Sequence, residues 1–322
     1  MVGFAGATTN PMKISVPVHI NATRLLPFLT LISQPIASEE IVVDFTRLRR
    51  VTPAGLVALS ATVIRWLKAH HRVRFQGLNG CPIADYLRRM DLLKVCGFDS
   101  AEGFTRHDSR GRFVPVKLVD EHVPEMGHEI ATCLAPGGDE WGHPKADLYD
   151  LVFYVMTEIA NNIRQHSLGL GYASAQVTRA EGLVRVALAD NGIGILGSFI
   201  HARQPWSKGM NDPQGILKAL EPKVSCKGGE PNEGVGLTLV SALARLTKSW
   251  LMIVSGSGVV QILPQVTGTQ AFQLPDGGIY PGTIIAMTCR QEAANGFSKL
   301  LHTAKDEAGL LRRGTIKARF EP

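Results

Sequence analysis

The chain has 322 residues, of which 45% are hydrophobic and 19% are charged, and its formal net charge is +6. A chain of this length can form two domains. It contains no run of 18 apolar residues, so a membrane-spanning helix is excluded and no membrane contact is expected. Residues 1–10 lack a basic start followed by an apolar core, so no signal peptide is expected.

The cysteine, histidine and basic residues indicate which kinds of site and partner to expect. The 5 cysteines include no CxxC pair, which argues against a zinc site or a disulfide framework and favours a reducing, cytoplasmic location. The 10 histidines show no HExxH or similar metal-binding spacing. The basic residues are spread out in small groups, so nucleic-acid binding is not favoured.

The first hundred residues alternate between strand-like and helix-like segments. Strands are expected at 12–19, 40–45 and 73–77, and helices at 22–32, 55–70 and 82–93. This alternation predicts an open α/β sheet with helices packed on it.

The segment from Val43 to Leu56 is more specific. It reads Val-Asp-Phe-Thr-Arg-Leu-Arg-Arg-Val-Thr-Pro-Ala-Gly-Leu and resembles the core of STAS domains, the anti-anti-sigma-factor fold. In that family a strand ending in Asp-Phe/Leu-Ser/Thr leads to a loop of Asp-Ser-Ser-Gly type and then to a helix. The resemblance covers residues 10–100 and implies a STAS-like regulatory or interaction domain at 1–100.

This segment departs from the STAS pattern at the phosphorylation position. Switch proteins of that family carry a phosphorylatable serine where this chain has Pro53 and Ala54, neither of which accepts phosphate. Thr52 supplies the nearby hydroxyl. We therefore expect a domain that does not run the usual phospho-switch and that docks instead against the second domain or a partner.

Polar residues at 101–111 form the expected linker to a second domain. That domain begins with a predicted strand at 112–119 and a helix at 123–134, followed by a loop at 136–143. A long helix is expected at 145–166, because seven apolar residues recur there at helical spacing.

Three polar residues line up on that long helix. Glu158, Asn162 and His166 are spaced i, i+4 and i+8, so they share one stripe. Asn162 offers a hard amide oxygen to an octahedral Mg²⁺, and Glu158 is one turn away, where it can orient or deprotonate an attacking water or hydroxyl. His166 can hydrogen-bond phosphate or cap the helix end. Taken alone, the row is more typical of the solvated polar face of an amphipathic helix.

A second signal follows two predicted strands at 173–179 and 183–190. Asp190 ends the second strand, and Gly192 and Gly194 allow backbone conformations closed to other residues and a close approach to a ligand. A plain Asp-Asn-Gly turn joining two elements has the same pattern.

A third signal opens a helix that is predicted to start at residue 234. Gly234 and Gly236 precede an apolar run that begins at Leu237. Free backbone N–H groups at a helix start form an anion site. A glycine hinge before a core helix is the plain alternative.

The order and spacing of the three signals carry more information than any one of them. They are Thr157-Glu-Ile-Ala-Asn-Asn-Ile-Arg-Gln-His166, Asp190-Asn-Gly-Ile-Gly194 and Gly234-Val-Gly-Leu237. Together they resemble the GHKL ATPases, which include histidine kinases, the type II topoisomerase and mismatch-repair ATPase domains, the heat-shock chaperone and the anti-sigma-factor serine kinases. The resemblance covers residues 112–290 and implies an α/β sandwich whose mixed or antiparallel sheet carries helices on one face.

The GHKL resemblance also implies ligands and roles. The ligands are ATP and Mg²⁺, with Asp190 accepting a hydrogen bond from the adenine amino group and Asn162 holding the metal. Glu158 then assists attack on the γ-phosphate, and the glycine pair at 234–236 with Leu237 receives phosphate oxygens.

The stretch from Ile195 to Glu233 is rich in proline and glycine, and a short helix is expected at 216–220. A connection this long is usually functional or disordered, and in the resembled family it is the lid that closes over the phosphates. Lys227 is the best-placed candidate phosphate contact, and the others are Lys208, Lys223 and Ser225. For each of these lysines, taken alone, a solvated loop residue is the plain alternative.

The rest of the second domain is predicted as strands followed by a tail. The strands lie at 250–255, 259–263, 269–274 and 283–289, and the tail at 291–311 is helical. Gly282-Thr283 resembles the Gly-Thr start of the last GHKL sheet strand, where Thr283 helps hold the adenine end.

The predicted protein is therefore a STAS–GHKL fusion that binds Mg·ATP in signal transduction. It is an ATPase or a serine/threonine kinase acting on a protein partner, such as a regulator or antagonist. Histidine-kinase behaviour is not expected, because no dimerising helical hairpin with an acceptor histidine precedes the ATPase domain. The alternative is a non-catalytic, nucleotide-dependent protein-interaction switch, and a homodimer is compatible with either.

Overall fold

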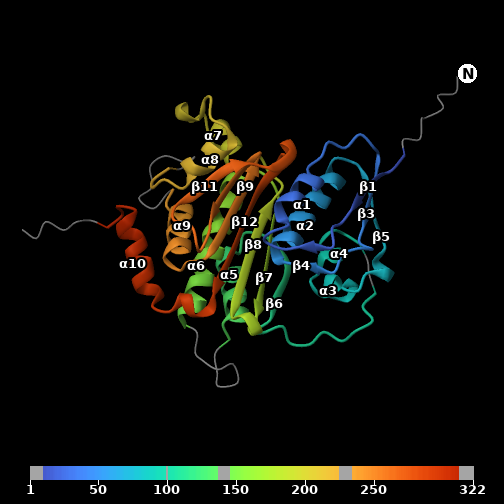
Figure 1. The fold of residues 1–322 in the computed structure, drawn as a ribbon, viewed down its shortest axis with the longest axis horizontal. Coiled ribbons are helices and arrows are strands. Elements are labelled where there is room, and N and C mark those ends of the chain that lie inside the picture. Colours follow the sequence, from blue (N-terminus) through green and yellow to red (C-terminus); the bar gives the residue numbers. More distant parts are fainter. Residues whose placement is uncertain (1–9, 99–100, 137–145, 225–233, 312–322) are drawn as a thin grey trace, which may run out of the picture.

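The structure is a computed structural model that describes residues 10–98, 101–136, 146–224 and 234–311. Within these ranges the chain forms sheets of three, seven and two strands together with helices, so the predicted α/β class is confirmed. None of the described helices is both long enough and apolar enough to cross a membrane. Figure 1 shows the N-terminal elements packed beside the large C-terminal sheet.

The N-terminal part is built on parallel strands. β1 (Met12–Ser15), β3 (Glu40–Asp44) and β5 (Arg72–Gln76) pair in the order β1-β3-β5. β2 (His19–Ile20) and β4 (Arg50–Val51) form a short parallel pair of their own. The helices are α1 (Leu25–Ile32), α2 (Pro53–Lys68), α3 (Ala84–Arg89) and α4 (Leu92–Val95). The predicted open sheet is present.

Two N-terminal boundaries differ from the prediction. The strand predicted at 12–19 is interrupted after Ser15, and its last residue belongs to β2. The single helix predicted at 82–93 is two helices, because Asp91 has a φ of 56° that an α-helix does not accommodate.

The C-terminal part contains a seven-stranded sheet in the order β11-β10-β9-β12-β8-β7-β6. Its strands are β6 (Phe113–Val119), β7 (Gly171–Thr178), β8 (Leu183–Asp190), β9 (Trp250–Gly256), β10 (Gly258–Ile262), β11 (Thr269–Gln273) and β12 (Tyr280–Arg290). Every neighbouring pair is antiparallel. The expectation of a mixed sheet is therefore wrong, and the antiparallel alternative is correct.

One face of this sheet carries the helices that the sequence predicts. They are α5 (Val123–Leu134), α6 (Ala146–His166), α9 (Gly236–Leu246) and α10 (Phe297–Glu307). The apolar side of α6 packs on β7 and β8, while α9 packs on β9 and β10. In Figure 1 the red helix α10 lies outermost, against α9 and α6.

The opposite face of the sheet is covered by α2, which contacts β7, β8 and β12. Twelve of its sixteen residues are buried, as expected for a helix that is apolar on nearly all sides. These side chains share one core with residues of the large sheet, including Tyr172, Ala189, Val254 and Tyr280. The helices α5, α6, α9 and α10 of the second domain therefore lie on one face, as predicted, and the other face is covered by the N-terminal part, which docks on the second domain as expected.

The linker at 101–111 contains no helix or strand and is tied to the N-terminal part. The Arg106 guanidinium contacts the carboxylates of Asp91 and Glu102. At the irregularity between Val114 and Lys117, the Val116 N–H donates to the Met90 carbonyl at 2.9 Å. The sheet edge formed by β6 is therefore bonded to the N-terminal part.

Residues 194–224 contain more helix than the predicted lid. α7 (Gly194–His201) and α8 (Asp212–Ala219) lie at the top of the sheet in Figure 1. The Asn211 side chain accepts a hydrogen bond from the Gln214 N–H and caps α8. The short helix predicted at 216–220 coincides with the second half of α8, and the prediction of a loop before it is wrong.

Candidate functional site

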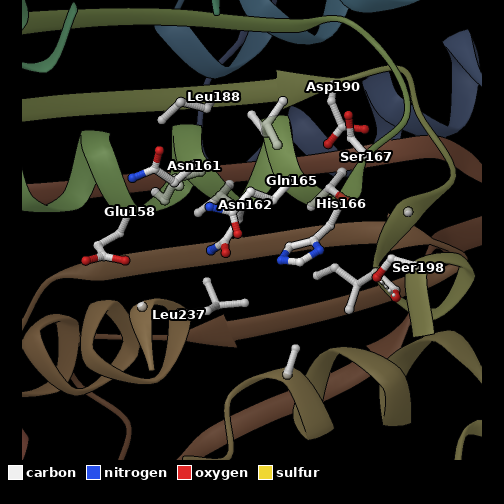
Figure 2. Close-up of a pocket in the computed structure, with 18 of the residues that line it drawn as sticks. Glu158, Asn161, Asn162, Gln165, His166, Ser167, Leu188, Asp190, Ser198 and Leu237 are labelled. Atoms are coloured by element: carbon white, nitrogen blue, oxygen red, sulfur yellow. Dashed lines mark hydrogen bonds between the residues drawn. The ribbon is translucent and has the colours of Figure 1, made fainter. Parts of the chain in front are cut away.

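A cavity of about 450 Å³ lies between α6 and α9, at the ends of β8 and β12. Helices α7 and α8 close its other side. Ligand pockets in proteins typically have volumes of roughly 300–1,000 Å³. The cavity is therefore large enough for a small molecule, and Figure 2 shows the side chains that line it.

The predicted row on α6 faces this cavity. Glu158, Asn162 and His166 are all lining residues and are half-buried, so they do not form a fully solvated helix face. In Figure 2 they project from one helix, with Glu158 at one end and His166 near Asp190 at the other. Eight helical residues advance about 12 Å, so the row presents an extended strip of polar groups to a ligand.

Glu158 lies where α6 approaches the start of α9. Its Oε2 occupies the space that a side chain at Gly236 would need. Tyr154 is hydrogen-bonded to Glu158, and Lys305 on α10 adds a positive charge nearby. Burial raises the pKa of the Glu158 carboxyl, while the Tyr154 bond and the Lys305 charge lower it. The group is therefore closer to the pKa of a general base than an exposed glutamate is.

The start of α9 leaves backbone donors available. Val235 occupies the N-cap position and makes no side-chain capping bond. Gly234, with a φ of 72°, and Gly236 both line the cavity, as does Leu237. Uncapped N–H groups at a helix start attract anions. This end of the cavity therefore suits a negatively charged ligand group.

Asp190 forms the opposite end of the cavity. It is the last residue of β8 and its side chain is 2% exposed. Its Oδ1 accepts a hydrogen bond from the Gly192 N–H at 2.8 Å, and Thr283 also hydrogen-bonds the carboxylate. Burial nevertheless raises the pKa of Asp190 to about 7. A buried acceptor of this kind is best satisfied by a ligand that donates hydrogen bonds.

The two glycines after Asp190 have different roles. Gly192 does not line the cavity, because it packs against the Ser167 carbonyl, where no side chain would fit. Gly194 does line the cavity and has a φ of 73°, which favours glycine. Of the two glycines that were expected to approach a ligand, only Gly194 lines the cavity.

Thr283 reaches the site through an irregularity in β12. The register of β12 against β9 shifts between Tyr280 and Thr283, and Gly282 has a φ of 102°. The buried Ser255 hydroxyl donates to the Gly282 carbonyl at 3.2 Å and accepts the Ile195 N–H at 2.8 Å. Bulges of this kind commonly lie beside functional sites, and this one brings Thr283 into the lining.

Those predicted phosphate-binding lysines that the structure describes do not line the cavity. Lys208 and Lys223 are exposed and are not lining residues. Lys227 and Ser225 lie outside the described residues, so their predicted contacts stay predictions. No lysine or arginine is present among the lining residues that the structure describes.

Several lining residues were missed by the sequence analysis. They are Ser167, Leu188, Ile195, Ser198, Phe199 and Ile285, together with Asn161 and Gln165. Ile195, Ser198 and Phe199 are spaced i, i+3 and i+4, which is the signal of a helix face. This signal was available in the stretch that was interpreted as a lid.

The donors near Asn162 fit a magnesium ion that keeps most of its ligands as water and phosphate. The Asn162 amide faces the cavity one turn from the Glu158 carboxylate, and both offer hard oxygen atoms. In the described part of the chain, no group of three or more His, Cys, Asp and Glu residues could form a complete metal cage. A metal here therefore needs a ligand that brings oxygens of its own.

Comparison of the chain with protein-family models, with curated proteins and with solved structures finds no match.

Proposed function

We propose that this chain is a GHKL-type ATP-binding protein that holds Mg·ATP between α6 and α9. The proposal depends on one observation, which is that different polar groups lie at the two ends of a single cavity. The buried Asp190 carboxylate lies at one end, and Glu158 and Asn162 lie beside the start of α9 at the other. Such a cavity suits a ligand with a hydrogen-bond donor on a base at one end and phosphates with a cation at the other.

At the base end, Asp190 accepts a hydrogen bond from the adenine amino group. Guanine carries a carbonyl oxygen at the corresponding position, which would face a carboxylate oxygen. Ile195 and Phe199 on α7 provide apolar surface for the ring. His166 lies at this end in Figure 2, so we assign it a contact with the sugar or base in place of the predicted phosphate contact.

At the phosphate end, the N–H groups at the start of α9 receive phosphate oxygens, and Asn162 holds Mg²⁺. The bound metal neutralises charge that develops on the transferring phosphoryl group. Glu158 orients or deprotonates the attacking water or hydroxyl, a role that its raised pKa supports. The activity is ATP hydrolysis or serine/threonine phosphorylation of a protein regulator or antagonist in the cytoplasm.

We also propose that residues 1–100 are a STAS-like regulatory domain. The parallel strands β1, β3 and β5 with flanking helices support this assignment. A non-catalytic switch is the second candidate function, and it is favoured by the position of the Glu158 carboxylate, which lies directly against Gly236 of α9.

Calorimetric titration with ATP, ADP and GTP, with and without Mg²⁺, tests the binding proposal. We expect both adenine nucleotides to bind, GTP to bind at least about tenfold more weakly, which corresponds to about 1.4 kcal/mol, and Mg²⁺ to strengthen ATP binding. Asp190→Asn should reduce the preference for ATP. Absence of binding by either adenine nucleotide would overturn the proposal.

Incubation with ATP labelled on the γ-phosphate separates the activities. Free labelled phosphate indicates an ATPase, labelled partner protein indicates a kinase, and neither indicates the switch. If a Glu158→Ala variant turned over ATP at the rate of the parent, the catalytic role of Glu158 would be refuted. The proposal that the cavity binds a nucleotide would still stand.

A further inference from the structure

The turn that carries Asp190 is hydrogen-bonded from behind to the N-terminal part of the chain. Asn191 Nδ2 donates to the Ala61 carbonyl on α2 at 3.3 Å. The Asn191 Oδ1 accepts the Leu170 N–H at 2.9 Å. One side chain therefore connects the turn both to α2 and to the residue that precedes β7.

A second connection runs through Tyr280. Its hydroxyl donates to the Asp190 carbonyl at 3.4 Å and is also hydrogen-bonded to the Thr62 side chain on α2. Tyr280 is 1% exposed and Thr62 is 2% exposed, so water does not replace these bonds. Two consecutive residues of α2 are thus connected to the turn: Ala61 directly through Asn191, and Thr62 through Tyr280, which bonds the Asp190 carbonyl.

The residues that follow Asp190 and Asn191 in the turn are also held in place. Gly192 packs on the Ser167 carbonyl without room for a side chain, and the Ile193 N–H donates to that carbonyl at 2.8 Å. Buried polar groups keep their hydrogen-bond partners. A displacement of α2 therefore either breaks the bonds of Asn191 and Tyr280 or displaces Asp190 with it.

We infer that Asn191 and Tyr280 are positioning residues through which α2 sets the affinity of the cavity for the adenine end of its ligand. This inference rests on the proposed function. Binding of a partner to the N-terminal part acts on Asp190 by moving α2, while Asn162 on α6 and the start of α9 lie on the opposite face of the sheet from α2. Because coupling is reciprocal, adenine binding in turn stabilises the docked position of α2.

Near-isosteric variants on both sides of the contact test the inference in the full-length chain. Tyr280→Phe and Thr62→Val remove single hydroxyl groups and leave Asp190 in place, and Thr62→Ser restores the hydroxyl. Thr30→Val is the matched control, because the Thr30 hydroxyl bonds the Pro275 carbonyl at 3.0 Å and joins the same two parts of the chain elsewhere.

The measurements are the Kd values for ATP and GTP, each with and without Mg²⁺, and amide hydrogen exchange of α2 with and without ATP. We expect Tyr280→Phe and Thr62→Val to weaken ATP binding by about fivefold to tenfold and to lower the preference for ATP over GTP. The strengthening by Mg²⁺ should be retained. ATP should protect the α2 amides in the parent, in Thr62→Ser and in Thr30→Val, and less so in the two hydroxyl-deleted variants.

Unchanged ATP affinity and unchanged α2 protection in Tyr280→Phe and Thr62→Val would overturn the inference. An equal loss in Thr30→Val would also overturn it, since the effect would then be general loosening between the two parts. If the parent itself binds no adenine nucleotide, the proposed function fails as well, which the parent titration shows before any variant is compared.

Discussion

The Glu158 carboxylate on α6 lies in the space that a side chain at residue 236 on α9 would occupy. Gly236 is therefore required for the position of Glu158 as well as for access to the helix start. This contact brings together the first and third sequence signals, which are separated by about seventy residues in the chain.

Gly236→Ala is expected to displace Glu158 without disturbing the helix, because alanine favours helical backbone. If Glu158 is the general base, ATP turnover should fall by about 100-fold. Steady-state turnover of this variant, of Glu158→Gln and of the double variant measures the effect. The double variant should be no slower than Glu158→Gln alone, since both changes remove the same interaction.

Gly103→Ala serves as the control for this glycine substitution, because no atom lies within 4 Å of an added Cβ there. Its turnover should match that of the parent. Additive losses in the double variant would show that Gly236 acts independently of Glu158.

Asn162→Ala should remove the effect of magnesium on ATP binding. The amide oxygen is the proposed metal ligand, and alanine leaves the α6 backbone unperturbed. ATP affinity without Mg²⁺ should stay within about twofold of the parent, whereas the gain on adding Mg²⁺ should fall by about tenfold. Titrations with and without Mg²⁺ measure this, with Asp150→Ala, at an exposed position of α6 outside the cavity, as the control. A full Mg²⁺ response in Asn162→Ala would refute the metal assignment.

Much of the second domain follows from the periodicity of its apolar residues. The helix predicted at 123–134 is α5 with the same bounds, and the predicted strand ending in Asp190 is β8. The apolar stripe of α5 and the nearly continuous apolar run of β8, which is buried on both faces, are each visible in the local sequence. The row of Glu158, Asn162 and His166 could be predicted for the same reason, because helical spacing alone places it on one stripe.

The remaining features depend on contacts that a local pattern does not specify. Pro205 and Pro213 were interpreted as loop residues, yet Pro205 begins a 3₁₀ turn and Pro213 lies in the first turn of α8, where proline is tolerated. The apolar character of α2 indicated burial but not which surface covers it. Ser255 and Tyr280 support the site through long-range hydrogen bonds, which leave no trace in sequence spacing.

The raised pKa of Asp190 should make the stability of the protein depend on pH. Its pKa is about 7 in the folded chain and 3.8 when unperturbed, so between these values the folded state binds a proton that the unfolded state lacks. This contribution is fully present below about pH 4 and is lost as the pH rises through about 7, at about 1.4 kcal/mol per pH unit.

Chemical denaturation of the parent and of Asp190→Asn across this range isolates the contribution, because other titrating groups are common to both proteins. The parent should lose stability relative to the variant as the pH rises from about 4 to about 7, and the difference should level off above that. A difference that is constant with pH would show that Asp190 titrates normally.

Gly55 on α2 packs closely against the β2–β4 pair. A Cβ added there would lie 2.9 Å from Val51 Cγ2 and closer still to Ile20 Cγ2. Gly55→Ala should therefore lower the free energy of unfolding by about 1–3 kcal/mol through overpacking. Gly80→Ala, where nothing lies within 4 Å, should change it by less than about 0.5 kcal/mol, and equal stability of the two variants would contradict the packing argument.

Thr52 is expected to remain unphosphorylated when the protein is incubated with Mg·ATP. Its hydroxyl donates to the Ile20 carbonyl at 3.2 Å, and the following Pro53 and Ala54 are buried. These three residues line a small cavity against Trp250 of β9, so this segment faces the large sheet. A kinase would have to undock α2 to reach it.

Labelled ATP followed by peptide mapping measures this, with Thr52→Ala as the comparison. The variant should lose about 1 kcal/mol of stability with the Ile20 hydrogen bond but show the same labelling as the parent. Label in the parent peptide that disappears in Thr52→Ala would mean that the N-terminal part undocks and runs a phospho-switch through its threonine. In that case phosphorylation of Thr52 would displace α2 and so change the position of Asp190. The displacement would act through the same two hydrogen-bonded contacts that we assign to partner binding.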